Sequence, residues 1–482
     1  MSFEEFVLEV EKLQDEAVAI EDKEILEKAF VCAKEAHAGQ TRANGSAYFE
    51  GHSIPVALNV AILKMNTRMI AAALLHDVIE DTDVTKEDIA KICDEDIAEM
   101  VDGVSKLSKV KYKGNDRHVE SLRKFFVAIA KDARVVIIKL CDRWHNLETL
   151  HFLPLEKRER IAKESILIHA QLASRLGMGK LASTLKDLSF PYAYPNEYEK
   201  TSRVINEAMM LANNVIETMF QELEPMCMAT IGYKADIDKR VKGLYSSYKK
   251  LERKNWNISE LHDLVALRVI VKDLDDCYRM LGAIHAKWHP APGRLKDYIA
   301  LPKPNGYKSL HTTVISRSGL FVEIQIRTHA MHAFDEFGIA SHHSYKNRQS
   351  GEIRESFEWL SQLGSLNEEK LSPDEYIHEL RSDFFEDRIF ALTPKGDVID
   401  LPVGATLLDF AYSLHSDIGD KAQGGKINGK YCALNTEIPS ESVVEIVVSS
   451  RNKPSDKWLE WVRTNHARVK IKRRLSLARS NE

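Results

Sequence analysis

The stretch "LLHDVIEDT", residues 74–82, follows the apolar run "MIAAA" and gathers titratable side chains between positions 76 and 81. These side chains are His76, Asp77, Glu80 and Asp81. Because an unpaired charge is costly to bury, we expect the groups either to be solvated at a helix end or to surround a cation. On one continuous helix, residues four apart share a face, so His76 would lie beneath Glu80 and Asp77 beneath Asp81.

Two candidate metal ligands lie elsewhere in the chain. His52 follows "AYFEG", and Asp142 lies in "KLCDRWHNLETL". With His76 and Asp77 they make two imidazoles and two carboxylates, which leaves coordination positions open and suits Mn²⁺ or Fe²⁺ at least as well as Zn²⁺. A further carboxylate nearby would orient or deprotonate a metal-bound water, as hydrolytic metal sites require. The pair "HD" alone, however, is more often a solvated helix end.

The bulk composition is that of an ordinary globular chain of about three domains. The 482 residues are 44% apolar, with a net charge of −5. The six cysteines occur singly, without a CxxC pair, which favours reduced thiols in a cytosol and argues against a disulfide framework or a zinc ribbon. The acidic start "MSFEEFVLEV" and the lack of an apolar run near about 20 residues predict neither secretion nor membrane insertion.

Hydrophobic periodicity divides the chain into segments of different kinds. The first 190 residues repeat apolar positions at helical spacing, and "SFPYAYPNEY" (189–198), with two prolines, is expected to be a linker. A long helix from about residue 200 then leads to two predicted strands, "DLVALRVIV" (263–271) and "LFVEIQI" (320–326). The predicted parts are an all-α domain at 1–195, an α+β domain at 196–345, a charged helical linker at 346–384, a small β-rich module at 385–450 and a basic helical tail at 451–482.

The segment "KRVKGLYSSYKKLERK" (239–254) is strongly basic. If it is helical, Lys242 and Lys249 lie seven apart on one face with Ser246 between them, which would form a cradle for a polyphosphate. A solvated basic helix is the alternative, and this segment alone does not separate the two.

Two strands suggest a second site. Glu323, Gln325 and Arg327 alternate with apolar residues in "FVEIQIRT", so these three polar groups share one strand face. Asp263 begins the other strand, and if the strands are neighbours it could meet Glu323. Paired carboxylates that hold Mg²⁺ beside basic phosphate clamps are what transfer of a phosphoryl-type group requires. An exposed sheet face would show the same alternation.

Four segments in order, "AHAGQTRANGSAYFEGH", "AALLHDVIEDTDVT", "VDGVSKLSK" and "IIKLCDRWHNLETL", closely resemble the HD-type hydrolase domain of the RelA/SpoT family, enzymes of (p)ppGpp. The resemblance implies a metal site, usually for Mn²⁺, with the ligands His52, His76, Asp77 and Asp142. It implies that Glu80 and Asp81 act on the attacking water, that Arg42 packs on the guanine, and that Asn146 and Thr149 contact the nucleotide. Departures are Ser53 where the family usually has proline and Ala43 where it usually has lysine.

The segments "HDLVALRVIV", "NGYKSLH" and "VEIQIRTHAMH" resemble the nucleotidyltransferase-like synthetase domain of the same family, which moves pyrophosphate from ATP to the 3′-hydroxyl of GDP or GTP. The resemblance assigns ATP to Arg240, Lys242 and Lys250, Mg²⁺ to Asp263, and activation of the 3′-hydroxyl to Glu323. It places Tyr307 on the acceptor guanine, with Lys303, Asn305 and His311 nearby. The run from Arg294 to Asp297, which includes Lys296, has the "RxKD" form of bifunctional members, whereas Gly243 stands where histidine is common.

The stretch "FALTPKGDVIDLPVGATLLDFAYSLH" resembles a TGS domain, a small β-grasp-like module. His415 matches a histidine that meets the acceptor end of uncharged tRNA in ribosome-bound relatives, although a histidine on a helix is more often only a packed residue. The zinc-finger or conserved-cysteine domain and the ACT-type domain of full-length relatives are expected to be absent.

The leading hypothesis is therefore a bifunctional, cytoplasmic (p)ppGpp synthetase and hydrolase whose two activities are reciprocally coupled through residues 190–240. One alternative keeps only the hydrolase strongly active and makes the synthetase domain a nucleotide sensor. Another makes the chain chiefly a ribosome- or tRNA-binding factor that acts through its TGS module and basic tail.

Overall fold

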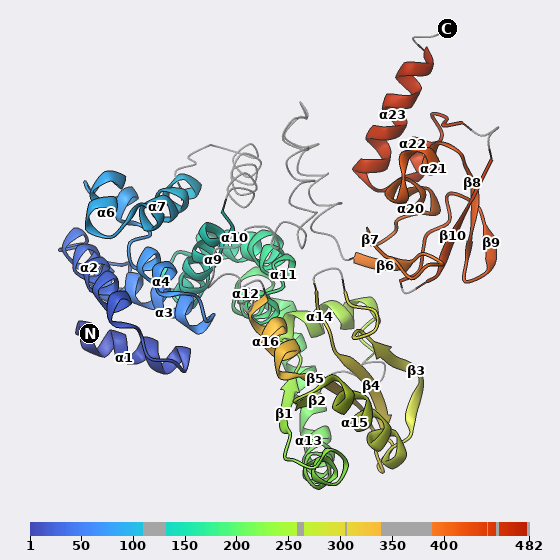
Figure 1. Ribbon diagram of the computed structural model, residues 1–482, viewed down its shortest axis with the longest axis horizontal. Coiled ribbons are helices and arrows are strands. Elements are labelled where there is room, and N and C mark those ends of the chain that lie inside the picture. Colours follow the sequence, from blue (N-terminus) through green and yellow to red (C-terminus); the bar gives the residue numbers. More distant parts are fainter. Residues whose placement is uncertain are drawn as a thin grey trace. The chain divides into compact units, whose positions relative to one another are not determined.

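A computed structural model of the chain describes residues 1–108, 132–257, 265–303, 306–338, 388–440, 442–449 and 453–479 (Figure 1). The described residues up to 338 form one compact unit, and those from 388 onward form another. The predicted helical linker at 346–384, and the candidate residues Asp263 and Asn305, lie outside the described residues.

The N-terminal part of the first unit, in its described residues up to 193, is built of helices joined by short turns and loops. Its α-helices are α1 (Phe3–Gln14), α2 (Ile20–Ala36), α3 (Ile54–Ile62), α4 (Thr67–Leu74), α5 (Val78–Asp81), α6 (Lys86–Ile92), α7 (Glu95–Ser108), α9 (Ala133–Glu148), α10 (Leu155–Glu164), α11 (Ala170–Arg175) and α12 (Gly179–Ala193). Short π-helical turns η1 (Phe49–Ser53) and η3 (Ser165–His169), and the 3-10 turn η2 (Leu150–Phe152), join some of them. The prediction of an all-α first region agrees with this order.

The predicted continuous helix through His76 and Asp77 is wrong. Helix α4 begins at the Asn66 cap, buries every residue from Met69 to Leu74, and then ends. Ala73 O, which would accept from the backbone of Asp77 in an unbroken helix, is instead contacted by His76 Nδ1 at 2.8 Å. The chain therefore turns at residues 75–77 and starts the short helix α5, so the imidazole of His76 is set by a break in the helix.

The predicted linker at 189–198 is also wrong, because only Tyr194 separates two helices there. Helix α12 runs through Pro191 to Ala193, and helix α13 (Pro195–Ile231) starts at Pro195. A proline at the first helical position loses no hydrogen bond and already has a helical φ, so Pro195 starts a helix instead of preventing one. The long helix predicted from about residue 200 is α13.

Helix α13 leads into a five-stranded sheet. The remaining elements are β1 (Asp236–Val241), α14 (Leu244–Arg253), β2 (Val265–Val271), α15 (Leu274–Lys287), β3 (Pro290–Asp297), β4 (Leu310–Ile315), β5 (Phe321–Thr328) and α16 (His329–Phe337). The strand order is β1-β2-β5-β4-β3, with β2 and β5 parallel and the other neighbours antiparallel. The two strands predicted from sequence are thus neighbours, as the second-site hypothesis requires.

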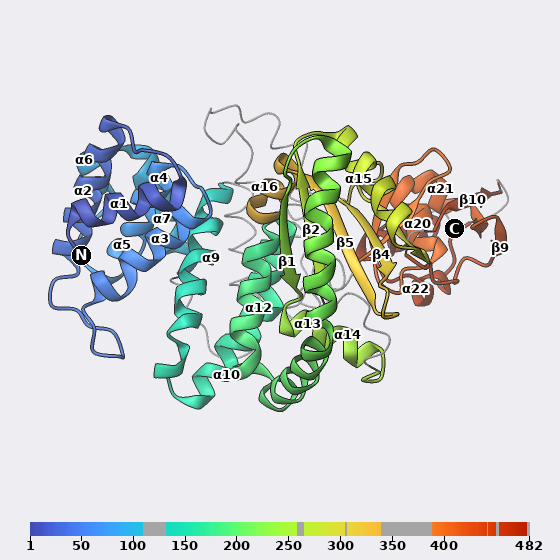
Figure 2. The ribbon, with the colours of Figure 1, turned by 90° about the horizontal axis from the view of Figure 1, so that it is seen from below.

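The two faces of the sheet have different roles. Alternate residues of β2 and β5 (Leu267, Val269 and Val271; Val322, Ile324 and Ile326) pack in one buried core with α13 and α15. Figure 2 shows α13 alongside β1 and β2. Since side chains alternate along a strand, Glu323, Gln325 and Arg327 lie on the opposite face.

The predicted basic helix at 239–254 begins later than expected. Lys239, Arg240 and Val241 end strand β1, and α14 starts only at Leu244 after its cap Gly243. Lys242 precedes the helix and Lys249 lies within it, so the two do not share a helical face, and only Lys242 lines the cavity described below.

The second unit is a small α/β module. It contains β6 (Arg388–Leu392), β7 (Val398–Pro402), α20 (Leu407–Leu414), α21 (Ser416–Asp420), β8 (Ala422–Ile427), β9 (Lys430–Cys432), β10 (Val444–Val448), α22 (Trp458–Trp461) and α23 (Asn465–Arg479). The predicted basic tail forms α23, whose Ala467 and Ile471 share a core with Leu408 and Tyr412 of α20. Among the described residues of the whole chain, no helix combines the length and apolarity needed to cross a membrane.

Candidate functional sites

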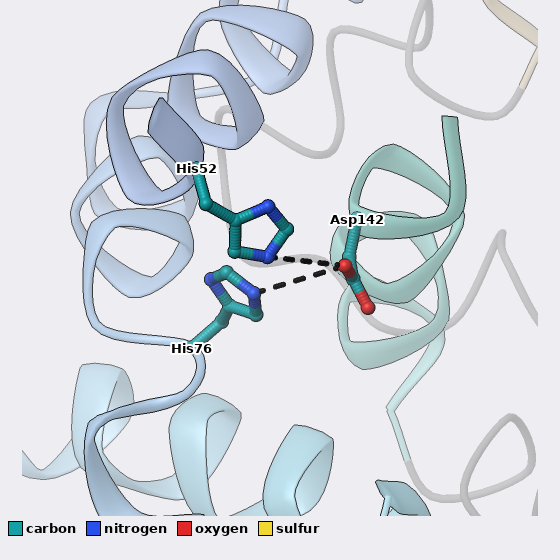
Figure 3. Close-up of side chains that lie close together, drawn as sticks. All are labelled: His52, His76 and Asp142. Carbon is teal, nitrogen blue, oxygen red and sulfur yellow. Dashed lines mark ion pairs between the residues drawn. The ribbon is translucent and has the colours of Figure 1, made fainter. Parts of the chain in front are cut away.

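Three residues from separate elements meet in the helical part of the first unit (Figure 3). They are His52 in η1, His76 in the turn after α4, and Asp142 in α9, and one ligand atom of each lies within 4.8 Å of the others. His52 Nε2 is 3.3 Å and His76 Nε2 is 4.0 Å from Asp142 Oδ1. Asp77 Oδ2 contacts the same two nitrogens, at 3.4 Å from His52 and 2.8 Å from His76. All four predicted ligands are therefore brought together.

The imidazoles are oriented by contacts on their far sides. His76 Nδ1 lies against the Ala73 carbonyl, which places the ring proton there and leaves the Nε2 lone pair facing the cluster. His52 Nδ1 lies 2.8 Å from His145 Nδ1. Burial, followed by the nearby His52 and Arg42, lowers the pKa of His145 to about 3. His145 is therefore neutral, and its Nδ1 can accept a hydrogen bond from the Nδ1–H group of His52. Both Nε2 atoms then point toward the carboxylates, as a metal ligand set needs.

The carboxylates have their own partners. Tyr48 donates its hydroxyl proton to Asp77 Oδ2 at 2.6 Å, and Lys139 lies 2.7 Å from Asp142 Oδ2. Burial disfavours the charged form of Asp142, but the Lys139 ammonium and the two imidazoles outweigh it and hold the pKa of this carboxyl well below its usual range. Tyr48 and Lys139 were missed from sequence. Their signals were positional only, since Tyr48 stands four residues before His52 and Lys139 three before Asp142.

These residues fit a divalent cation. The Nε2 atom of His76 is fully buried and has no hydrogen-bond partner of good geometry, although Asp77 lies close to it. A buried nitrogen lone pair that faces a second imidazole and two ionised carboxylates is a mixed N/O donor set of the kind that first-row divalent metals bind.

The predicted nucleotide contacts lie next to this cluster. Arg42 Nη2 donates to Asn146 Oδ1 at 3.1 Å and to Thr149 Oγ1 at 3.0 Å, so these three candidates form one group. Asn146 also donates to Asp142, which joins the group to the ligands. Glu80 and Asp81 line an open pocket together with Gln40, whose amide donates to the Asp81 carbonyl, and none of the four predicted ligands lines this pocket.

A second cavity, of about 460 Å³, lies on the polar face of the sheet. It contains all the synthetase candidates that the structure describes: Arg240, Lys242, Lys250, Lys296, Lys303, Tyr307, His311 and Glu323. Arg294, Tyr298, Thr313, Gln325 and Asp335 also line it and were not among the predicted site residues. The concentration of basic side chains around one carboxylate is suited to a polyphosphate next to a group that accepts a proton.

A directed chain of hydrogen bonds runs through this cavity. Arg327 Nη2 donates to the Tyr307 hydroxyl at 2.8 Å, and that hydroxyl lies 2.7 Å from His311 Nε2. His311 Nδ1 lies 3.2 Å from Glu323 Oε1, to which Gln325 Nε2 also donates. Burial lowers the pKa of His311, so the neutral ring accepts from Tyr307 at Nε2 and donates to Glu323 at Nδ1. Lys303 Nζ lies 4.6 Å from the ring centre of Tyr298 and 4.8 Å from that of Tyr307, at the edge of this network.

Comparison with known families matches three regions of the chain. An HD domain model matches residues 29–179, the model of the region found in RelA/SpoT proteins matches residues 239–350, and a TGS domain model matches residues 389–448. Each predicted domain type thus finds its counterpart, in the predicted order. The chain belongs to the RelA/SpoT family.

Curated RelA/SpoT relatives align with most of this chain. A guanosine-3′,5′-bis(diphosphate) 3′-pyrophosphohydrolase of Aquifex aeolicus is 42% identical over 93% of the chain and 64% of its own length. A GTP pyrophosphokinase of Myxococcus xanthus is 39% identical over 94% of the chain and 60% of its own length. The bifunctional (p)ppGpp synthase/hydrolase SpoT of Escherichia coli K12 is 40% identical over 93% and 64%. The chain therefore spans less than two thirds of the length of these relatives.

Among solved structures, the small alarmone synthetase 1 of Bacillus subtilis bound to its product pppGpp is 23% identical, with a TM-score of 0.26, over 34% of this chain and 92% of that one. The family models confirm the predicted fold class of this RelA/SpoT chain, with an HD domain, a synthetase region and a TGS domain. The HD domain also implies a divalent metal, in agreement with the donor set at His52, His76 and Asp142.

His415, for which the family resemblance implies a contact with tRNA, is exposed at the start of α21. Its Nδ1 accepts from the backbone N–H of Asp417 at 3.2 Å and so caps that helix. A capping role accounts for a polar residue here, and the ring remains open to solvent.

Proposed function

We propose that this chain is a bifunctional alarmone enzyme. One site removes the 3′-pyrophosphate of (p)ppGpp to leave GDP or GTP, and the other transfers pyrophosphate from ATP to the 3′-hydroxyl of GDP or GTP. The observation that carries the proposal is that one chain holds two separate sites: a buried His/Asp cluster and a basic cavity centred on Glu323. The names of the relatives, which include a hydrolase, a pyrophosphokinase and a bifunctional enzyme, support the same reading.

In the hydrolase site, His52, His76, Asp77 and Asp142 would hold Mn²⁺. When bound, the ion would supply a water of lowered pKa and a Lewis acid for the departing phosphate. Glu80 and Asp81 orient the attacking water and take up its proton; they follow the ligands His76 and Asp77 closely in the chain and line one open pocket. Arg42, fixed by Asn146 and Thr149, holds the guanosine part of the substrate.

In the synthetase site, Arg240, Lys242 and Lys250 bind the ATP phosphates, and Asp263 would hold Mg²⁺. Glu323 accepts the proton of the 3′-hydroxyl while the 3′-oxygen of the acceptor nucleotide forms a bond to the β-phosphorus of ATP. The bond from the β-phosphorus to the oxygen shared with the α-phosphate then breaks, and AMP leaves. Tyr307 stacks on the acceptor guanine with Lys303 and Asn305 nearby, while His311 holds Glu323 from behind.

Two substitutions test the two-site assignment directly. Asp77→Ala should abolish breakdown of (p)ppGpp and leave synthesis intact, and Glu323→Ala should do the reverse. Turnover in both directions, measured with metal analysis of the purified chain, checks this. A single substitution that removes both activities would contradict the assignment of separate sites.

Coupling between the two activities is part of the proposal, because running both at once would only consume ATP. Helix α13, which follows α12 after a single residue and packs on the sheet, provides a physical connection. Each activity should fall when the opposite site is saturated with its nucleotide. Two rates that do not respond to each other would remove this part of the proposal.

The second unit is proposed to contact uncharged tRNA, and through it the ribosome, with His415 and the basic helix α23. The solvent exposure of His415 supports this. Capture of uncharged tRNA should survive an increase in salt if it is specific, and should vanish if it is only charge attraction. A cytoplasmic location is also proposed, supported by six cysteines that are all free.

A further inference from the structure

Helix α12 ends the predicted hydrolase region, yet it contacts α14 and α16, two helices that each supply a residue to the lining of the synthetase cavity. We infer that α12 is a positioning element of the synthetase site: Asp187 holds the side of the cavity that binds ATP, and the Gly179 end holds the side that binds the acceptor nucleotide. The inference rests on the proposed function, because it assigns donor and acceptor sides to that cavity.

The first contact is a helix cap supplied from another part of the chain. Helix α14 has Gly243 at its N-cap position, which offers no side chain to accept from the helix N-terminus. Asp187 of α12 takes this part, since the backbone N–H of Tyr245 donates to Asp187 Oδ1 at 2.9 Å. A carboxylate at a helix N-terminus both satisfies a free N–H group and interacts favourably with the helix dipole.

The local sequence permits this approach only because residue 243 is glycine. A Cβ at position 243 would lie 2.5 Å from Asp187 Oδ2 and 2.9 Å from Ser183 Oγ, closer than side-chain atoms tolerate. The departure from the histidine common in the family at this position therefore has a structural reason in this chain. With glycine there, α14 can begin directly against the Asp187 carboxylate.

This cap bears on the phosphate side of the cavity. Lys250 of α14 lines the cavity, and Lys242 directly precedes Gly243. Because the N-terminus of α14 already faces a carboxylate, the phosphates are left to the side chains of Lys242, Lys250 and Arg240, and the direction of α14 decides where Lys250 lies. Loss of the cap should therefore weaken the binding of ATP more than that of the acceptor nucleotide.

The second contact lies at the other end of α12. A Cβ at Gly179 would lie 2.9 Å from the backbone oxygen of Asp335 in α16, and a Cβ at Gly338 would lie 2.3 Å from the Leu176 oxygen. Helix α16 thus rests directly on the start of α12, where Lys180 and Glu336 also form an ion pair at 3.1 Å.

Helix α16 carries this contact to the acceptor side of the cavity. Asp335 pairs with Arg327, whose side chain is fully buried and whose other nitrogen donates to the Tyr307 hydroxyl. A displaced Asp335 would leave the buried Arg327 charge poorly paired, which is costly, so Arg327 and Tyr307 should follow it. Gly179 is therefore three contacts from the ring proposed to stack on the acceptor base.

Substitutions at the two ends of α12 separate this role from general destabilisation. In the full chain, Asp187→Ala removes the cap, Asp187→Asn keeps a side-chain oxygen that can accept the Tyr245 N–H, and Gly179→Ala adds one methyl group against Asp335. Ser2→Ala, which removes the cap of the remote helix α1, and Gly282→Ala, which places a Cβ where no atom lies within 4 Å, are the matched controls.

The measurements are the KM for ATP and the KM for GDP in synthesis, with kcat and the rate of hydrolysis. Asp187→Ala should raise the KM for ATP by about three- to tenfold, the range expected from a lost N-cap, and leave the KM for GDP nearly unchanged. Asp187→Asn should recover most of this loss. Gly179→Ala should raise the KM for GDP by about fivefold, as a modest overpacking cost predicts, and leave the KM for ATP nearly unchanged.

The outcomes are separable. Equal KM values in all variants, or parallel changes in both KM values, would overturn the inference while leaving the bifunctional assignment in place. Absence of product from ATP and GDP with the unsubstituted chain would overturn the proposed function and the inference with it. If Asp187→Ala does not fold, Gly179→Ala with its Gly282→Ala control still decides.

Discussion

The two sites of this chain are built in opposite ways. The ligands of the hydrolase cluster come from separate helical elements and are almost fully buried, with exposures of 1% for His52, 0% for His76 and 5% for Asp142. The synthetase site is a cavity of about 460 Å³ on one sheet face, lined by long basic side chains. The difference follows from what each must hold, because a cation needs a few fixed lone pairs, whereas a nucleotide polyphosphate needs a broad surface of positive charge.

The largest difference between the sites should appear on removal of a buried ligand. Asp142→Ala should lower hydrolysis by more than about a hundredfold, since loss of even an outer partner of a metal ligand costs roughly 10–100-fold. Synthesis should be retained, because Asp142 does not line the second cavity. Initial rates in both directions measure this, with Asp102→Ala, at an exposed ion pair with Lys106, as the control. Hydrolysis within a few-fold of the unsubstituted rate would contradict the assigned ligand set.

The second cavity is tested by the residue behind its proposed base. His311→Phe removes both the contact to Glu323 and the contact to Tyr307, so synthesis should fall by about tenfold to a hundredfold in kcat. This is less than the full contribution of a general base, about a hundredfold to ten-thousandfold, because Glu323 itself remains. Hydrolysis should not change. The control His285→Phe alters a histidine on the opposite side of the sheet, which contacts Thr312. A change confined to the KM for GDP would show that His311 binds the nucleotide and does not act on Glu323.

A milder test concerns the contacts that fix the buried cluster. Tyr48→Phe removes the hydroxyl that donates to Asp77, so the affinity for the divalent metal should fall by about tenfold. A calorimetric titration of the metal-free chain with Mn²⁺ measures this affinity without any turnover of substrate. Tyr194→Phe serves as the control. An unchanged affinity would mean that Asp77 is held by the imidazoles alone.

The smallest effect on the two activities is expected from the second unit, none of whose described residues belongs to the His/Asp cluster or lines the basic cavity. Thr406 caps α20 by accepting from the backbone of Asp409, and Thr406→Ala should destabilise that unit by about 1 kcal/mol. Both activities should stay within the error of the unsubstituted chain, as followed by denaturant unfolding and by rates. A loss of either activity would show that the second unit supports catalysis.

Sequence predicted which side chains meet better than it predicted the backbone that carries them. Residue types together with the family resemblance pointed to His52, His76, Asp77 and Asp142, and these four are brought together, but the helix period suggested one unbroken helix where a side-chain contact from His76 to Ala73 O ends it. Prolines suggested a linker where Pro195 starts a helix. In the first place the hydrogen bond from His76 to Ala73 O ends the helix, and in the second the position of Pro195 at the start of a helix makes it compatible with one. The periodicity of apolar residues shows neither feature.

The partners of the site residues were harder to predict than the residues themselves. Lys139, His145 and Arg327 sit in ordinary helix and strand patterns, and only the three-dimensional arrangement shows that they hold a ligand or a ring. The last three residues of β1 were included in a possible helix, because a strand of six residues is too short to show a period of two clearly. The two short apolar runs predicted the strands β2 and β5, but whether they are neighbours was left open and is shown only by the structure, which pairs them in parallel.

The single residue between α12 and α13 limits how the enzymatic unit can deform. Tyr194 has φ −144° and ψ 68°, and helices of 15 and 37 residues leave it on either side. At 1.5 Å per residue, α13 is a rod of about 55 Å, so a rotation of about 10° at this one joint would sweep its far end through about 10 Å. A single residue between two helices cannot take up a change in their angle over several bonds, so a small change in the backbone torsions of Tyr194 becomes a large displacement at the far end of α13.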